Sequence, residues 1–450
     1  MSNRKWLDHR TIWRWHFYAG LFCVPFIIAL ALSGSLYLFK PQVEAWIDRP
    51  YDNLTLTGPA ADANAQALAA LAAVPGGSLK TYILSEHPTD AVRVQIRDGQ
   101  GALWRVYVHP QTLSILHKVR EEDRLMEQVK TFHGELLMGD RGSWLVELAA
   151  CWGIVMVASG LYLWWPRDRS GWAGVIYPRL SAGGRMFWRD LHGVVGIWVS
   201  FLALFLLLTG LPWAGVWGGA FKMVREATGT AAVKQDWTTS RSAERAAHDV
   251  HEHADTAPMD HGSLSMDDMM VGAATLSDVV TRIAPLNLPA PVHINLPNKP
   301  GAPWAVRSLT ANRPQRVSID LDGTTGDLLR REEFADRHVI DRVVGVGIAA
   351  HEGQLFGAFN QLLGVLAALG LVLLSVSGVV MWWKRRPSGA LGAPPPLRIK
   401  GSSAVMGLIL LGFALFLPLL GLSVIIVALI DLALLRQWRK GRQWLGLRMT

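Results

Sequence analysis

Residues Trp15 to Phe39 read WHFYAGLFCVPFIIALALSGSLYLF, an apolar stretch that contains no Asp, Glu, Lys or Arg. A helix needs about 20 mostly apolar residues to cross the hydrocarbon core of a bilayer. This stretch is long enough, and it is too long for the apolar region of a cleaved signal peptide, which has about 7–15 residues. We therefore predict a membrane-spanning helix that stays in the protein.

Three more stretches of this kind follow: Trp144 to Trp165, Leu191 to Trp213 and Phe359 to Trp383. The only Asp, Glu, Lys or Arg within them is Glu147. A fifth apolar tract, Val405 to Ile430, is interrupted by Pro418. It predicts either a hairpin broken at Pro418 or one long helix kinked there, and the hairpin is favoured because it keeps the basic residues after the tract in the cytoplasm.

The composition agrees with a membrane protein and excludes other classes. Of the 450 residues, 50% are hydrophobic and 18% charged, whereas soluble domains have about 25% charged residues. Intrinsic disorder is excluded by the abundance of apolar residues, and a disulfide scaffold by the presence of only two cysteines. The net charge of +8 comes from bases beside the apolar stretches, so no nucleic-acid partner is expected.

Basic residues predict the orientation in the bilayer, because short Lys/Arg-rich flanks mark the cytoplasmic side. The bases in the link between the second and third stretches and directly after the fourth are Arg167, Arg169, Arg179, Arg185, Arg189, Lys384, Arg385 and Arg386. The N-terminus and these two segments are therefore expected in the cytoplasm. Residues 41–143 and 214–357 are expected on the opposite side.

Each of these two long segments shows a helical region followed by several alternating, strand-like runs. In the first, a helix at 60–74 precedes runs at 80–84, 91–97, 103–109 and 114–119; in the second, a helix at 277–284 precedes runs at 292–295, 304–310, 316–321 and 327–331. This pattern is typical of antiparallel α+β structure. The similarity of the two segments indicates a duplicated module.

The expected fold is thus a membrane all-α bundle of four core transmembrane helices, plus a C-terminal hydrophobic tract, with two α+β modules outside. The expected division is 1–40 (N-terminal tail and first span), 41–143 (first module), 144–213 (second span, cytoplasmic loop and third span), 214–357 (His/Met-rich linker and second module), 358–386 (fourth span) and 387–450 (cytoplasmic loop and C-terminal tract).

Four histidines lie at the ends of the four spans. His16 and His192 are on the cytoplasmic side of the first and third spans, and His133 and His351 precede the second and fourth spans on the outer side. In an up-down four-helix bundle the first and third helices are diagonal partners, as are the second and fourth. The topology therefore predicts two histidine pairs at two depths.

Haem is the cofactor that best explains this arrangement, because neutral imidazole is a good axial ligand for haem iron. Gly20 and Gly196 each follow a histidine by four residues, on the same helical face, and could leave room for a porphyrin. The sequence has no Cys-x-x-Cys-His motif, so two non-covalent b-type haems are expected. Histidines that carry a metal ion or protons are disfavoured, because the spans lack the mid-bilayer carboxylates expected of ion transporters. The other alternative is that all four histidines have only structural roles.

A His/Met-rich stretch, between His248 and Met270, precedes the second module. Its ligand-type residues are His248, His251, His253, Met259, His261, Met266, Met269 and Met270. Imidazole and thioether ligands together suit copper, so His248, His251, His253 and His261 are candidates for a weak copper or iron site. The alternative is a solvated linker.

Four histidine motifs and the span that follows the last of them resemble the family of PepSY-associated transmembrane proteins of bacterial inner membranes. They are Trp13-Arg14-Trp15-His16, Phe132-His133-Gly134-Glu135, Arg189-Asp190-Leu191-His192-Gly193, His351-Glu352-Gly353-Gln354 and Met381-Trp382-Trp383-Lys384. The resemblance covers about residues 10–386. It implies that both outer modules are PepSY domains in the periplasm and that His16, His133, His192 and His351 bind haem.

Some members of this family are haem-containing reductases that release iron from ferric siderophores at the periplasmic face. The resemblance implies an inner-membrane oxidoreductase that transfers electrons to a periplasmic ferric siderophore or other ferric chelate. Some relatives carry a cytoplasmic flavin domain; this sequence has none, so a separate cytoplasmic protein, a small reductant or membrane quinol is expected as donor. Alternatives are a cupric reductase or copper-handling protein, and a non-redox PepSY-type sensor or permease.

Overall fold

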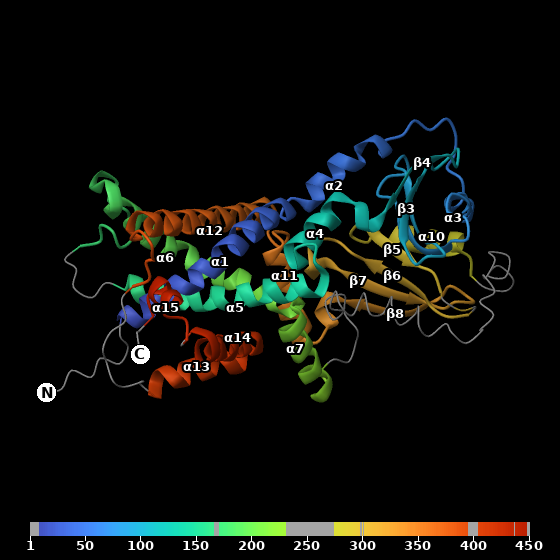
Figure 1. Ribbon diagram of the computed structural model, residues 1–450. Coiled ribbons are helices and arrows are strands. Elements are labelled where there is room, and N and C mark those ends of the chain that lie inside the picture. The colour runs from blue at the N-terminus through green and yellow to red at the C-terminus, as the bar shows by residue number, and fades with distance from the viewer. Residues whose placement is uncertain are drawn as a thin grey trace. The chain divides into compact units, whose positions relative to one another are not determined.

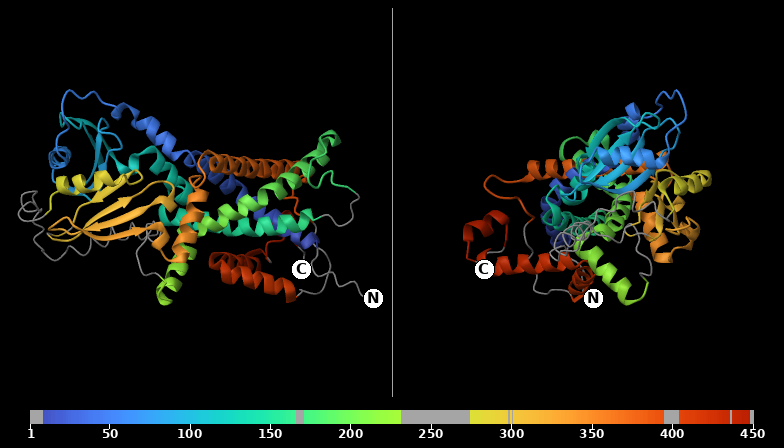
Figure 2. Two further views of the ribbon diagram at one scale, coloured as in Figure 1. Left: turned by 180° about the vertical axis from the view of Figure 1, so that it is seen from behind. Right: turned by 90° about the vertical axis from the view of Figure 1, so that its right-hand side faces the viewer.

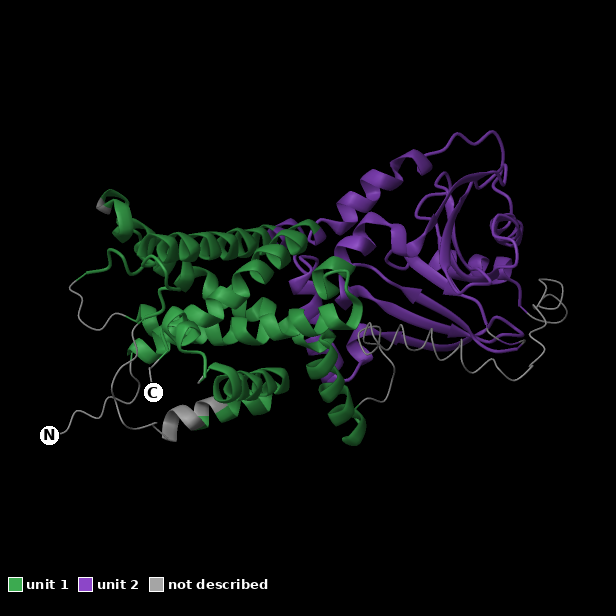
Figure 3. Cartoon of the chain, viewed as in Figure 1, with its two compact units in different colours: residues 1–36, 131–242, 362–450 green, residues 37–130, 243–361 purple. Residues whose placement is uncertain are grey.

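The computed structural model describes residues 9–165, 171–230, 274–297, 299, 301–394, 404–435 and 437–447. The chain divides into two compact units, which Figure 3 colours separately. The first unit comprises residues 1–36, 131–242 and 362–450, and the second comprises residues 37–130 and 243–361. Each unit therefore combines segments from both halves of the sequence.

The first unit is built around long helices that lie side by side (Figures 1 and 2). They are α1 (His9–Tyr37), α5 (Gly139–Trp164), α6 (Gly184–Gly210) and α12 (Ala358–Arg385). A glycine permits close packing between two of them, because a Cβ on Gly370 of α12 would collide with Val199 of α6.

Five described segments are long and apolar enough to cross a membrane: His9–Tyr37, Gly139–Trp164, Gly184–Trp213, Ala358–Arg385 and Pro418–Leu435. The first four overlap the four uninterrupted stretches predicted from the sequence. Many large apolar side chains on these helices are exposed in the protein alone, among them Leu32, Phe201 and Leu369. Such exposure is expected of helices whose outer faces are covered by lipid instead of protein.

The C-terminal tract forms α13 (Ala404–Phe416), α14 (Pro418–Ile430), a π-helical turn (Asp431–Leu435) and α15 (Arg439–Leu445). The helix breaks at Leu417, because a residue before proline disfavours the α conformation. The chain folds back there: a Cβ on Gly421 would lie 3.0 Å from the Cβ of Ala414. This favours the broken form of the tract, although α13 alone is short for a bilayer crossing.

The second unit contains one antiparallel sheet of eight strands in the order β4-β3-β2-β1-β5-β6-β7-β8. The strands are β1 (Ser78–Leu84), β2 (Val92–Arg97), β3 (Leu103–Val108), β4 (Ile115–Arg120), β5 (Val292–Asn295), β6 (Trp304–Ser308), β7 (Val317–Leu321) and β8 (Leu328–Glu333). Each overlaps a strand-like run of the sequence. The two predicted modules are joined through β1 and β5, where Tyr82 pairs with Ile294.

One face of this sheet carries the apolar core of the unit. Helices α3 (Ala63–Ala72) and α10 (Leu276–Ile283) contact each other and lie over this face (Figures 1 and 2). Asp62 caps α3 by accepting from the N–H of Ala65, and Thr275 caps α10 in a capping box with Asp278. Each half of the sheet thus contributes one capped helix and four strands to a shared core.

Candidate functional site

The structure brings His16 of α1 and His192 of α6 together inside the first unit. Their ring centroids are 6.3 Å apart, and the ring planes cross at 86°. The expected proximity of these two histidines therefore holds in the structure. That these two histidines bind haem stays a prediction. The surroundings of each ring support this prediction.

His16 is held on one edge by α5. Its Nδ1 lies 2.9 Å from the Oγ of Ser159. The next residue is Gly160, where a Cβ would lie 3.2 Å from the Cε1 of His16. The Nδ1–Cε1 edge of the ring therefore faces α5, and Nε2 lies on the other edge.

His192 is held in the same way by α12. Its Nδ1 lies 3.0 Å from Ser377 Oγ and 3.1 Å from the carbonyl oxygen of Leu374. A Cβ on Gly378 would lie 3.5 Å from the Cε1 of the ring. Because a carbonyl oxygen can only accept, Nδ1 of His192 carries the proton and Nε2 has the free lone pair.

These features fit a group bound between two imidazoles. Metal–imidazole bonds are about 2.0–2.1 Å long, so two rings that bind one iron from opposite sides have centroids roughly 6–6.5 Å apart. The observed 6.3 Å lies in this range. A metal-bound histidine usually donates its other ring N–H to a neighbouring acceptor, as Nδ1 does here.

His133 lies in the last turn of α4 (Leu125–Glu135). Its Nδ1 is 3.0 Å from Ser33 Oγ of α1, and a Cβ on Gly34 would lie 3.0 Å from its Cε1. His351 is the last residue of α11 (Val339–His351) and belongs to the second unit. The pairing of His133 with His351 stays a prediction.

The glycines chosen from the sequence differ from those beside the rings. A Cβ on Gly20 would lie 3.6 Å from Met156, and a Cβ on Gly196 would lie 3.7 Å from Leu374. The glycines that contact the imidazoles each directly follow a serine: Gly34, Gly160 and Gly378. Sequence reasoning missed these Ser-Gly pairs, although their regular spacing from the histidines is a signal that could have revealed them.

Glu147, the acidic residue within the second predicted span, has a structural role. It is 2% exposed and lies in α5. Its carboxylate accepts from the backbone N–H groups of Val216, at 2.8 Å, and Trp217, at 3.0 Å. These N–H groups lie in the first turn of α7 (Gly215–Ala227), so Glu147 caps that helix.

The predicted copper or iron ligands His248, His251, His253 and His261 lie outside the described residues. Within the described part of the chain, no cluster of three or more His, Cys, Asp or Glu side chains could hold a metal ion. Two arginines of the second half of the sheet bond to the protein itself. Arg307 pairs with Asp320 at 2.7 Å, and Arg316 donates to the carbonyl of Thr310 at 2.8 Å.

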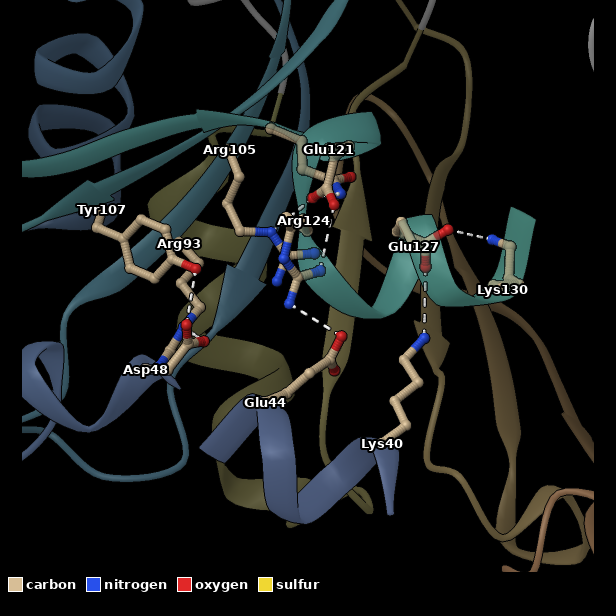
Figure 4. Close-up of polar contacts among 11 residues, drawn as sticks. Lys40, Glu44, Asp48, Arg93, Arg105, Tyr107, Glu121, Arg124, Glu127 and Lys130 are labelled. Atoms are coloured by element: carbon tan, nitrogen blue, oxygen red, sulfur yellow. Dashed lines mark hydrogen bonds and ion pairs between the residues drawn. The ribbon is translucent and has the colours of Figure 1, made fainter. Parts of the chain in front are cut away.

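A network of charged side chains occupies the sheet face opposite the apolar core (Figure 4). It includes α2 (Lys40–Asp48), a 3-10 turn (Glu121–Asp123) and the start of α4. Arg105 and Arg124 both pair with Glu121, at 2.5 and 3.2 Å, and Arg124 also reaches Glu44 at 3.1 Å. Burial would raise the pKa of Glu121, but the two arginines lower it.

Two further groups of contacts belong to this network. Arg93 bridges Asp48, at 3.2 Å, and Asp52, at 2.7 Å. Burial and the nearby Asp48 raise the pKa of Tyr107 to about 12, so that its hydroxyl stays protonated and donates to Asp48 at 3.0 Å. The network fixes α2 and the first turns of α4 on the sheet, and the last turn of α4 carries His133.

The fold defines a membrane protein that has a histidine pair among the apolar helices of its first unit and one antiparallel sheet in its second unit. The model of the PepSY-associated TM region matches residues 13–385. The chain therefore belongs to the family of PepSY-associated transmembrane proteins, which confirms the resemblance seen in the sequence. A search of curated proteins finds no match.

Proposed function

We propose that the protein is an inner-membrane electron-transfer protein that holds two b-type haems and reduces a ferric siderophore or other ferric chelate at the periplasmic face. His16 and His192 would hold the inner haem, and His133 and His351 the outer one. The observation that carries the proposal is the 6.3 Å separation of the His16 and His192 rings, together with the hydrogen bonds at both Nδ1 atoms.

The proposed reaction is the transfer of one electron to each ferric ion. Haem iron bound by two imidazoles supplies a centre that accepts and donates single electrons. A cytoplasmic reductase or membrane quinol would be oxidised, and the chelated ferric ion would become ferrous. Ferrous iron is held less strongly by the hard oxygen ligands of a siderophore, so it would be released. The contribution of the protein is to orient the imidazoles and to keep them apart from bulk water.

The test begins with the absorption spectrum of the full-length protein purified in detergent, before and after reduction with dithionite. We expect the α and β bands of a bis-imidazole b-type haem, and a pyridine haemochrome assay should give two haems per chain. His192→Ala and His351→Ala should each remove about one haem. His87→Ala changes an exposed histidine in the second unit and should keep both.

A colourless protein that takes up no haem on reconstitution would overturn the proposal and favour the non-redox sensor or permease. A protein with two haems that reduces no ferric chelate would keep the cofactor assignment and overturn the substrate. Both outcomes are read from the same preparation, so the cofactor and the acceptor are tested separately.

The second candidate function, cupric reduction, rests on the His/Met-rich stretch from His248 to Met270. Deletion of residues 248–270 separates the two functions. If copper is the physiological acceptor, the deletion should lower the rate of cupric reduction and leave ferric-chelate reduction unchanged. Unchanged rates for both metals would reject this candidate.

A further inference from the structure

Three histidines of the first unit each contact a Ser-Gly pair on a neighbouring helix. His16 contacts Ser159-Gly160, His192 contacts Ser377-Gly378, and His133 contacts Ser33-Gly34. The serine Oγ lies 2.9–3.0 Å from Nδ1 in all three cases. Three histidines on three different elements thus have the same local environment.

Each serine hydroxyl is placed to accept from its ring, because it also has a carbonyl acceptor for its own proton within its own helix. Ser159 Oγ donates to the carbonyl of Met156 at 3.2 Å, and Ser377 Oγ to that of Leu374 at 3.0 Å. Ser33 Oγ donates to the carbonyl of Ala29 at 2.9 Å. A hydroxyl has one proton and two lone pairs, so the lone pairs remain to accept from an Nδ1–H.

The glycines in two of the three pairs, Gly34 and Gly160, make this close approach possible. A Cβ would lie 3.0 Å from the imidazole Cε1 at Gly34, 3.2 Å at Gly160 and 3.5 Å at Gly378. The first two distances are shorter than ordinary van der Waals contact between carbon atoms, which begins near about 3.5 Å. At Gly34 and Gly160, glycine therefore allows the Nδ1–Cε1 edge of the ring to approach the helix while the preceding serine reaches Nδ1.

The spacing of these pairs is the same in the two halves of the sequence. The interval from His16 to Ser33-Gly34 equals the interval from His192 to Thr209-Gly210. Likewise, the interval from His133 to Ser159 equals the interval from His351 to Ser377. The duplication seen in the sheet therefore extends into the spanning helices and includes both the histidines and the hydroxyl–glycine pairs.

We propose that Ser33, Ser159 and Ser377 are positioning residues for the haem ligands. Each accepts the Nδ1–H of its histidine, fixes that tautomer and leaves the Nε2 lone pair to bind iron. Acceptance of this hydrogen bond makes the imidazole a stronger electron donor, which stabilises the ferric state and lowers the midpoint potential. The inference rests on the proposed function, because the iron belongs to the proposed haem.

Serines two positions away provide matched controls. Ser375, on the same helix as Ser377, is also buried and donates to the carbonyl of Leu371 at 2.9 Å. Ser35, on the same helix as Ser33, donates to the carbonyl of Ala31 at 2.7 Å. Replacement of either by alanine removes a hydroxyl from the same helix without removing a hydrogen bond to a histidine.

The experiment compares Ser159→Ala, Ser377→Ala and Ser33→Ala with Ser375→Ala and Ser35→Ala in the full-length protein. Redox titration of the absorption bands should show a more positive midpoint potential for one haem in each of the first three variants. Haem binding should be about 10-fold tighter in the controls than in those variants.

Rescue separates positioning from a general packing role. Ser159→Thr and Ser377→Thr keep the hydroxyl. Thr209 already occupies the place equivalent to Ser33 in the second repeat. Threonine should therefore restore the midpoint potential and the haem content. If the alanine variants and the controls have equal midpoint potentials, this inference is overturned. Two bound haems in the same proteins would still support the proposed function. Loss of haem in Ser159→Ala that threonine does not restore would also overturn this inference. A wild-type protein without haem would instead overturn the proposed function.

Discussion

At the scale of a single residue, Glu127 shows how charge holds α2 and the first turns of α4 together. It pairs with Lys40 of α2, at 3.4 Å, and with Lys130 of its own helix. Burial would raise the pKa of Glu127, but Lys130 and Lys40 lower it from 4.5 to about 2. A carboxyl group with a lowered pKa stabilises the folded state above its ordinary pKa, and this stabilisation is lost as the pH falls toward the lowered value.

We predict that Glu127→Gln destabilises the full-length protein by about 2 kcal/mol at pH 7, and that the difference from wild type shrinks between pH 4.5 and pH 2. The loss of stability is measured by thermal unfolding in detergent at pH 7 and at pH 3, with circular dichroism as the signal. Glu122→Gln is the control, because the side chain of Glu122 is 68% exposed and its pair with Arg120 contributes little. An equal loss of stability at both pH values would contradict the prediction.

At the scale of the element, the join between β1 and β5 makes one domain of two repeats. Ile294 of β5 is fully buried at this join, in the core beneath α3 and α10. Ile115 lies on the edge strand β4 and is 41% exposed. One sheet thus has an isoleucine at its buried centre and another at its exposed edge.

We predict that Ile294→Ala lowers the free energy of unfolding by about 2–4 kcal/mol, because it leaves a cavity in the shared core. Ile115→Ala should change it by less than about 1 kcal/mol. Denaturant unfolding of the full-length protein, with the sheet signal followed by circular dichroism, compares the two variants. Similar midpoints would indicate that the join does not carry the stability of the sheet.

The sequence predicts the helices and strands better than it predicts which of them contact each other. Alternation of apolar and polar residues predicts the strands, but the pairing of Tyr82 with Ile294 joins segments far apart in the chain and leaves no local pattern. Likewise, the apolar spans and their histidines were predicted, whereas the contact of His16 with Ser159 depends on how α1 and α5 are rotated against each other. Such rotation is set by tertiary packing.

At the scale of the whole molecule, each repeat contributes two spanning helices, two histidines and one half of the sheet. The proposed direction of electron transfer depends on how these parts are placed across the bilayer. The basic residues predict that the segment between α5 and α6 is cytoplasmic and that the sheet is periplasmic. Leu180 lies in the former and is 73% exposed, and Leu328 lies on β8 and is 59% exposed.

We predict that a membrane-impermeant maleimide labels Leu328→Cys when the outer membrane alone is permeable, and labels Leu180→Cys only after the inner membrane is opened. The native cysteines Cys23 and Cys151 are both buried and should give a low background in wild type. Labelling is read as fluorescence of the protein band. If Leu180→Cys reacts first, the orientation is inverted, and His16 and His192 would then lie on the side that faces the chelate instead of the electron donor.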